Sequence, residues 1–178
     1  MPSTEERLDR LESIDAIRDL VARYAVTLDE RDLDGLVGLF VDDVKASRHA
    51  PPGRAALKAH YETLADGWGY SIHQVFHQVI DFESAEEAMG RVYCRAEHET
   101  PSANTVAIAM LRYLDRYERR DGRWYFRWRR TAQWYVKQDS EAPMAQPRIN
   151  WPHQQPADAG LPDMIDTYRR YYELRPRS

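Results

Sequence analysis

Hydrophobic positions in the first part of the chain recur every three or four residues, which is the spacing of one face of a helix. Between residues 4 and 28 these positions are Leu8, Leu11, Ile14, Ile17, Val21, Tyr24 and Leu28. The pattern predicts one long amphipathic helix, and Ser3 with Glu6 supplies a capping box at its start. Shorter helices are predicted at 33–43 and 55–68, so the first 68 residues are expected to be mainly helical.

From residue 70 the chain becomes rich in β-branched and aromatic residues, which favour strands. Four such runs, bounded by turn residues, cover 70–82, 88–99, 104–120 and 123–137. Asp121-Gly122 joins the last two, and this pair favours a tight hairpin because both residues can adopt positive φ. Helices followed by a meander of long strands predict an α+β fold, with the helices packed on one face of a curved antiparallel sheet.

Residues 138–178 differ in composition from the rest of the chain. Six of the ten prolines lie between 143 and 176, and proline does not continue a sheet. Helical spacing returns at Ile165, Tyr168 and Tyr172. We therefore expect a body at 1–137 and, within the same domain, a proline-rich extension with a terminal helix. That extension would pack over the body or over a neighbouring subunit, as a lid or an exchanged arm, and a mobile tail is the alternative.

Composition and charge match an ordinary protein of one domain. The chain has 178 residues, of which 43% are hydrophobic and 30% charged, and its formal net charge is −4. This charge gives no general reason to expect nucleic acid or an anionic membrane as a partner. The single cysteine, Cys94, excludes an internal disulfide. A polar N-terminus without the features of a signal peptide, and the lack of a run of transmembrane length, favour a cytoplasmic location.

An arginine-rich run at 116–130 interleaves with aromatic residues and could imitate a nucleic-acid patch. Alternation along 123–136 places one set of polar residues on a common face, namely Arg123, Arg127, Arg129 and Gln133. We expect this face to be solvated, as most charge runs are, which argues against nucleic acid. Arg130 shares the opposite, apolar face with Trp128. A cation there needs a partner or a ligand, so Arg130 is a candidate binding residue.

His73 and His77 stand four residues apart in "SIHQVFHQVIDF" (71–82). On a strand both would lie on one face but roughly 13 Å apart, at about 3.3 Å per residue, which is too far to share a metal ion. The sequence also contains no HExxH motif and no cysteine cluster, so we expect no metal.

A histidine becomes a useful general base when a carboxylate orients it and stabilises its protonated form. Asp29 and Asp32 lie where the first helix is expected to end. Their ordinary interpretation is a loop residue and a helix N-cap, respectively. Alternation along 88–99 also points His98 inward, where a structural and a catalytic role are both open.

Three segments carry a family resemblance: "LDRLESIDAIRDLVARYAVTLDERDLDGLVGLF", then "SIHQV", then "YERRDGRWYFRWRR". In this order and at this spacing they resemble the SnoaL-like branch of the nuclear transport factor 2-like superfamily, over residues 5–137. The resemblance extends to scytalone dehydratase, bile acid 7α-dehydratase and γ-hexachlorocyclohexane dehydrochlorinase. It implies a cone-shaped α+β barrel, in which N-terminal helices and a strongly curved sheet enclose a pocket.

In these enzymes an aspartate at the end of the first helix and a histidine early in the sheet form a catalytic dyad. Asp29 and His73 stand at those positions. Two further catalytic candidates follow from the resemblance, Tyr24 and His98. The candidates for substrate binding are Arg130, at the place of a pocket-wall arginine, His77, where relatives usually carry asparagine, and Trp128.

The resemblance and the dyad predict a lyase that needs no cofactor and acts in aromatic compound metabolism. Water loss from a hydrophobic aromatic or polycyclic small molecule is the first expectation. The alternatives are a C–C lyase releasing formaldehyde from lignin-derived aromatic diols, a polyketide cyclase or isomerase, and a non-catalytic protein like the small subunit of ring-hydroxylating dioxygenases. A ketosteroid-isomerase mechanism is doubtful because "VKASRH" (44–49) offers no acid. We expect a homo-oligomer, with a trimer favoured, and neither nucleic acid nor membrane as partner.

Overall fold

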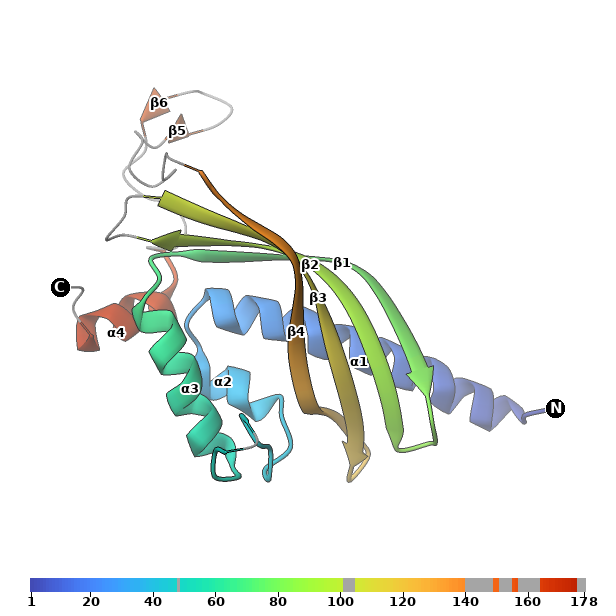
Figure 1. Cartoon of the computed structure of the whole chain (residues 1–178). Helices are drawn as coiled ribbons and strands as arrows, with labels where there is room; N and C mark the ends of the chain where they lie inside the picture. Colours follow the sequence, from blue (N-terminus) through green and yellow to red (C-terminus); the bar gives the residue numbers. More distant parts are fainter. Residues whose placement is uncertain (48, 101–104, 140–148, 151–154, 157–163, 176–178) are drawn as a thin grey trace.

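The computed structural model describes residues 1–47, 49–100, 105–139, 149–150, 155–156 and 164–175 (Figure 1). Three helices come first: α1 (Thr4–Asp29), α2 (Leu33–Gly38) and α3 (Arg54–Asp66). Four long strands follow: β1 (Ser71–Phe82), β2 (Glu87–Thr100), β3 (Thr105–Arg120) and β4 (Arg123–Asp139). The remaining elements are a short pair, β5 (Ile149–Asn150) and β6 (Gln155–Pro156), and a helix, α4 (Asp166–Leu174). The predicted α+β order is confirmed.

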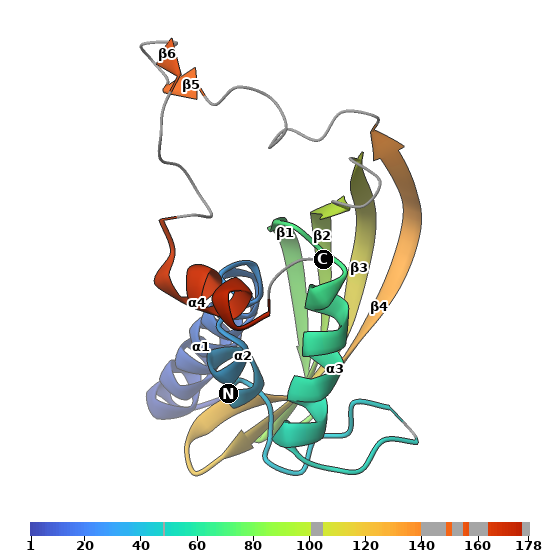
Figure 2. The same cartoon turned by 90° about the vertical axis from the view of Figure 1, so that its left-hand side faces the viewer.

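The long strands form one antiparallel sheet in the order β1-β2-β3-β4, strongly curved and not closed on itself. Helices α1, α2 and α3 lie on one side of it (Figure 2). The β3–β4 hairpin turns at Asp121 and Gly122, whose φ angles are 49° and 76°, as the sequence predicted. The expected barrel is therefore an open one, completed by helices rather than by further strands.

The two ends of α1 are built differently. At its start Ser3 and Glu6 form the predicted capping box, with the Glu6 amide donating to Ser3 Oγ at 3.1 Å. At its end the Asp32 amide donates back to the Thr27 carbonyl at 2.9 Å, and Arg31 has φ of 58°. This left-handed position after a helix usually belongs to glycine. Asp32 then caps α2 by accepting from the Gly35 amide at 2.9 Å.

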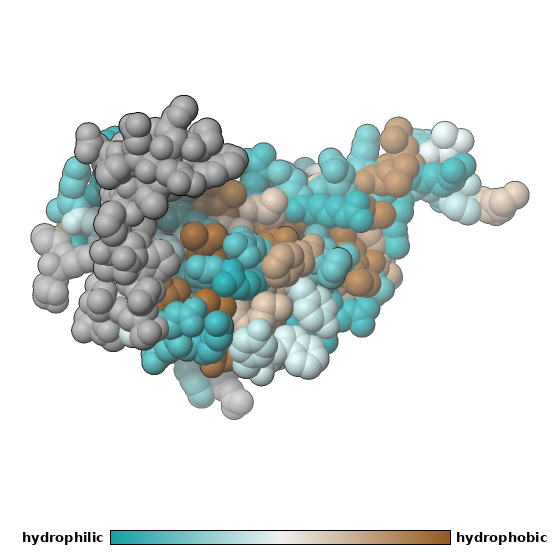
Figure 3. Space-filling model, turned by 90° about the horizontal axis from the view of Figure 1, so that it is seen from above, coloured by the Kyte–Doolittle hydropathy of each residue, from teal (hydrophilic) through white to brown (hydrophobic). Residues whose placement is uncertain are grey.

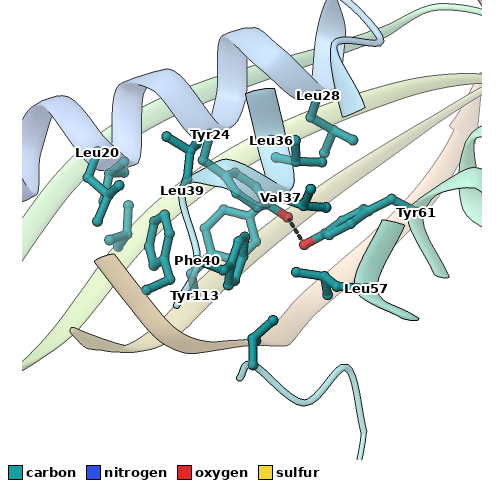
Figure 4. Packing of buried hydrophobic residues seen from close by; sticks show 14 of the residues in the cluster. Leu20, Tyr24, Leu28, Leu36, Val37, Leu39, Phe40, Leu57, Tyr61 and Tyr113 are labelled. Carbon is teal, nitrogen blue, oxygen red and sulfur yellow. Dashed lines mark hydrogen bonds between the residues drawn. The ribbon is translucent and has the colours of Figure 1, made fainter. Parts of the chain in front are cut away.

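The core lies between the helices and the concave face of the sheet (Figure 4). Its largest fully buried side chains come from α1, α2, the following segment and the inner positions of β3 and β4, among them Ile17, Leu36, Phe40, Tyr117 and Phe126. Two backbone hydrogen bonds, from Val41 N to Phe126 O at 3.0 Å and from Phe126 N to Leu39 O at 2.9 Å, attach the segment after α2 to β4.

Irregularities in strand pairing decide which side chains face the core. In β1 the register shifts between Val75 and Gln78, because Phe76 and His77 together face a single residue of β2. A bulge of this kind reverses the alternation of the strand beyond it. His77 is consequently exposed, and the expectation that it shares the inward face of His73 is wrong.

Two similar shifts in β4 overturn the predicted parity of the arginines. Trp128 pairs with Arg116 and Phe126 pairs with Tyr117, so Arg127 is the extra residue of a bulge. Beyond it the inward positions are 129, 131 and 133 instead of 128, 130 and 132. A second bulge at residue 134 returns Val136 to the inner face. The predictions that Arg130 lies on the inner face and Arg129 on the solvated face are therefore wrong.

Helix α4 packs against the end of α3 and the segment that follows it. Tyr171 donates to the Asp66 carboxylate at 2.8 Å, and Arg175 pairs with Glu62 at 2.8 Å. Most of the proline-rich segment before α4 lies outside the described residues, and its role as a lid or an exchanged arm stays a prediction. No helix among the described residues is long and apolar enough to cross a membrane.

The outer face of the sheet carries several exposed apolar side chains, which are Ile72, Phe76, Val79, Trp134 and Tyr135. Seen from above, brown apolar areas lie among teal polar ones (Figure 3). The expected homotrimer stays a prediction, which the mass of the native protein in solution tests directly.

A first prediction concerns Gly90 on β2. A Cβ at this position would lie 2.5 Å from the hydroxyl of Tyr117, a fully buried residue. Gly90→Ala should therefore displace the Tyr117 ring and destabilise the protein by about 1–3 kcal/mol, the usual cost of overpacking. Thermal unfolding measures the effect. Gly38→Ala is the control, because a Cβ there meets nothing within 4 Å. Equal melting temperatures for the two variants would contradict this account of the packing.

Candidate active site

A cavity of about 510 Å³ lies between the helices and the concave face of the sheet. Its aromatic and histidine lining comes from α1, α3, the segment after α3 and the inner positions of β1, β2 and β3: Tyr24, His60, Tyr61, Trp68, His73, His98 and Tyr113. Arg129, Thr131 and Gln133 of β4 add a polar wall. The cavity therefore combines aromatic and aliphatic walls with several polar groups directed into it, as small-molecule sites do.

Asp29 and His73 meet on the wall of this cavity. Asp29 is the last residue of α1 and His73 the third residue of β1, so the contact joins the helical layer to the sheet. His73 Nδ1 lies 2.6 Å from Asp29 Oδ1, and the His73 amide donates to Asp29 Oδ2 at 2.7 Å. Ser71 Oγ also donates to Asp29 Oδ1, at 2.9 Å. A carboxylate that already accepts two such bonds favours the tautomer with the proton on Nδ1. The basic lone pair of His73 is then on Nε2.

His98 lies beside this pair. Its ring is 5.1 Å from the His73 ring and 4.0 Å from Trp68, between centroids. Burial, together with the charges of His73 and Arg31, lowers the pKa of His98 to about 3. Its Nδ1 is buried and has no hydrogen-bond partner among the described residues. His98 is therefore neutral at ordinary pH and can exchange a hydrogen bond with a bound molecule.

Tyrosine hydroxyls form a second polar group in the cavity (Figure 4). The hydroxyls of Tyr24 and Tyr61 are 3.0 Å apart and hydrogen-bonded. Burial raises the pKa of both phenols and of Tyr113, so all three stay protonated. In a pair of hydroxyls one donates to the other, which leaves the second proton free for a ligand in the cavity.

Arg129 supplies the positive charge of the cavity. Its guanidinium makes a bidentate pair with the fully buried Asp115, at 2.8 and 2.7 Å, and Tyr117 also donates to Asp115 at 2.7 Å. The same guanidinium lies 4.2 Å from the centre of the Tyr24 ring and 4.0 Å from that of Tyr113. Among the described residues its Nη1 has no hydrogen-bond partner, so it can donate an additional hydrogen bond to a ligand oxygen or halide.

The structure brings four of the predicted site residues together: Tyr24, His73 and His98 line one cavity, and Asp29 is hydrogen-bonded to His73. It does not bring the other three there. His77 is exposed on the outer face of β1. Arg130 stacks on Trp128 at 4.9 Å, and both line a separate surface pocket of about 660 Å³ together with Lys45, Ser47 and His49. Within the part of the chain that the structure describes, the side chain of Asp32 makes only its helix-capping contact with the Gly35 amide.

Sequence reasoning missed Arg129, Tyr61 and Trp68. A signal for Arg129 did exist, because Asp115 alternates with Leu111, Tyr113 and Tyr117 on one face of its strand. A carboxylate on such an apolar face requires a buried cation. Across the described residues, no three histidine, cysteine, aspartate or glutamate side chains gather into a group able to hold a metal ion.

Comparison with known proteins agrees with the architecture. The SnoaL-like domain family matches residues 9–130, more than half of the chain. The chain belongs to this SnoaL-like family. The matched segment runs from α1 into β4 and includes both Asp29 and His73, whereas α4 lies beyond it. The resemblance to the SnoaL-like branch of the nuclear transport factor 2-like superfamily is thereby confirmed.

Several solved structures of other proteins resemble the fold of this chain. A type 2 hexachlorocyclohexane dehydrochlorinase is 26% identical with a TM-score of 0.67, covering 74% of this chain and 92% of its own. The type 3 enzyme from Novosphingobium barchaimii is 25% identical with a TM-score of 0.68, covering 75% and 94%. A protein from Novosphingobium aromaticivorans described as a putative scytalone dehydratase is 26% identical with a TM-score of 0.65, covering 72% and 89%. No curated protein matches the chain.

A second prediction follows from the buried neutral His98. The unfolded chain protonates this imidazole near its ordinary pKa of 6.5, whereas the folded protein does so only near 3. The unfolded state therefore binds more protons in this window, and the free energy of unfolding falls as the pH falls from 6.5 toward 3. His98→Gln should flatten this dependence, and melting temperatures across the window measure it. His77→Gln is the control, and parallel curves for His98→Gln and the wild type would contradict the assignment.

Proposed function

We propose that this SnoaL-like protein is a cofactor-independent lyase that eliminates water from a hydrophobic, aromatic or polycyclic small molecule. The observation that carries the proposal is the hydrogen bond of 2.6 Å between His73 and Asp29 on the wall of an aromatic-lined cavity. A dyad of this kind provides a general base without a metal or an organic cofactor.

In the proposed reaction His73 Nε2 removes a proton from a carbon of the substrate. The electron pair of that C–H bond forms the new double bond, and the adjacent carbon releases its hydroxyl group. Asp29 stabilises the imidazolium that forms, because it already accepts a hydrogen bond from Nδ1. The imidazolium then returns a proton to the departing oxygen, so that the products are an alkene and water and His73 is neutral again.

The other cavity groups support departure of the hydroxyl. A departing oxygen needs hydrogen-bond donors as its negative charge develops. The protonated Tyr24–Tyr61 pair has a free O–H, and Arg129 has a buried Nη1 whose bonds are unused among the described residues. A halide leaving group would have less need of such donors, and for this reason we favour water over chloride. The similar solved proteins include enzymes described by each of the two reactions.

Three alternatives use the same cavity: release of formaldehyde from lignin-derived diols, polyketide cyclisation or isomerisation, and a non-catalytic supporting role. The first two also require a base, so the dyad does not separate them from dehydration. The non-catalytic role requires no base, and the buried Asp29–His73 contact weighs against it. A role in aromatic compound metabolism and a cytoplasmic location are part of the same proposal.

A third prediction tests the dyad. His73→Gln and Asp29→Asn should each lower kcat by about 100- to 10,000-fold, which is the contribution of a positioned general base. A panel of hydroxylated phenolic and steroid-like compounds supplies substrates, and loss of water is read by mass spectrometry and by the absorbance of the new double bond. Chlorinated cyclohexanes are tested in parallel, and a chloride electrode measures any release of chloride from them.

His77→Gln is the matched control for this experiment, since it alters a histidine of the same strand on the outer face. Full activity of His73→Gln, with folding verified by thermal unfolding, would disprove the proposed mechanism. If the protein releases chloride and never water, the proposed dehydratase activity is wrong and the protein is a dehydrochlorinase.

A fourth prediction separates the two neighbouring arginines. Arg129→Lys keeps the charge but loses the bidentate contact with Asp115 and the stacking on Tyr24 and Tyr113. We expect it to cost about 1–3 kcal/mol of stability and to lower kcat/KM. Arg130→Lys, on the exposed face, should stay within about 0.5 kcal/mol of the wild type with unchanged kinetics. If Arg130→Lys lowers stability and kcat/KM more than Arg129→Lys does, Arg130 and not Arg129 is the arginine of the cavity.

A further inference from the structure

Arg31 is a buried cation immediately behind the dyad. Only 3% of the residue is exposed, and across the described residues no carboxylate contacts it directly. Its guanidinium donates to the Leu28 carbonyl at 2.7 Å, the Gly69 carbonyl at 3.0 Å and Ser71 Oγ at 2.8 Å. A buried charge without an adjacent counter-ion is costly. The negative charge closest to it along these contacts is Asp29, on the far side of the Ser71 hydroxyl.

The backbone of Arg31 adds a second unfavourable feature. Its φ of 58° is the left-handed conformation that glycine adopts without strain at the end of a helix. An arginine in this conformation persists only when contacts of its side chain offset the cost. The contacts of the guanidinium therefore offset the cost of the backbone conformation that the residue adopts.

Helix α4 covers this guanidinium. Arg31 Nε donates to the Tyr172 hydroxyl at 3.3 Å, and that hydroxyl lies 2.7 Å from the Trp68 carbonyl. The Tyr168 hydroxyl donates to the Gly69 carbonyl at 2.9 Å, and its ring lies 5.5 Å from the guanidinium. The family match ends at residue 130, and α4 lies beyond it. The contacts between α4 and Arg31 are therefore not part of the segment that the family shares.

The contacts form one continuous chain from α4 to the base. Tyr172 contacts Arg31, Arg31 donates to Ser71 Oγ, and Ser71 Oγ donates to Asp29 Oδ1. The same oxygen of Asp29 contacts His73 Nδ1. A hydroxyl that accepts from a cation and donates to a carboxylate is polarised along its bond and holds both partners in orientation.

We propose that α4 is a positioning element of the active site, in which Tyr172, acting through Arg31 and Ser71, fixes the orientation of the Asp29 carboxylate against His73. The expected effect on kcat rests on the proposed function, whereas the orientation of Asp29 by α4 does not. Without Tyr172, Arg31 gains freedom to leave Ser71, and the Ser71 hydroxyl then loses the cation that orients it toward Asp29 Oδ1.

The test reads the hydrogen bond itself. In a short histidine–carboxylate contact the Nδ1 proton gives a far-downfield proton resonance, and nitrogen-15 labelling of histidine assigns it to His73 through its absence in His73→Gln. Tyr172→Phe removes one hydroxyl, Ser71→Ala removes the link, and Arg31→Gly removes the guanidinium while suiting the backbone at φ of 58°. We expect the resonance to move upfield and to broaden by exchange in all three variants.

Tyr171→Phe is the matched control. Tyr171 lies on the same helix and binds Asp66 instead of Arg31. Tyr171→Phe should leave the resonance in place. This result would show that the shifts in the other variants come from loss of the contacts that link Tyr172 to Asp29 and not from a general loosening of α4. Wild-type resonances in Tyr172→Phe and Arg31→Gly would overturn the proposal, and so would an equal shift in Tyr171→Phe.

Kinetics supply the second readout once a substrate is in hand. We expect Tyr172→Phe and Ser71→Ala to lower kcat on the order of 10- to 100-fold with little change in KM, because misorientation of a catalytic group slows the chemical step. If His73→Gln retains activity, the proposed function is wrong. The resonance in the wild type, Tyr172→Phe and Arg31→Gly still tests whether α4 orients Asp29. A shifted resonance with wild-type kcat would overturn the catalytic part alone.

Discussion

The Asp29 carboxylate holds the helical layer to the sheet, and the geometry of the site depends on this contact. As the last residue of α1 it faces the negative end of the helix dipole, which disfavours an acid. It is stabilised there by the amide of His73 and the hydroxyl of Ser71, both at the start of β1. The same contacts that join α1 to β1 therefore set the position of the histidine. Fold and dyad are one arrangement, because neither the carboxylate nor the strand end is satisfied without the other.

A second constraint comes from the buried charges on the far wall of the cavity. Asp115 is fully buried, and its ion pair with Arg129 is enclosed by aromatic rings that stack on the guanidinium. Removing one partner of such a pair leaves an uncompensated charge and typically costs about 3–5 kcal/mol. The pair thus fixes Arg129 at the wall, and the tyrosines that accompany it stay protonated because burial raises their pKa. The cavity has the His73–Asp29 pair at one side and hydrogen-bond donors at the other.

Local signals in the sequence predicted much of this arrangement. The capping box at Ser3, the N-cap at Asp32 and the Asp121-Gly122 hairpin are short-range features, and each appears as expected. Periodicity placed Asp29 at the end of a helix and His73 in a strand, whereas their pairing was expected from the family resemblance. The position of Asp115 on an apolar strand face was a signal for a buried cation that the sequence reasoning did not use, and alternation alone assigned the wrong arginine.

The sequence by itself determined the element types, their order, the family and the chemical inventory of the site. Only the tertiary structure decided which neighbours face inward. An extra residue at 127 in β4 exchanges Arg129 for Arg130, and another in β1 turns His77 away from His73. The docking of α4 on Arg31 was likewise decided in three dimensions. The physical reason is that a bulge inverts every later side chain at little local cost, so its place is chosen by packing and pairing across the whole sheet and leaves no clear mark on the strand that carries it.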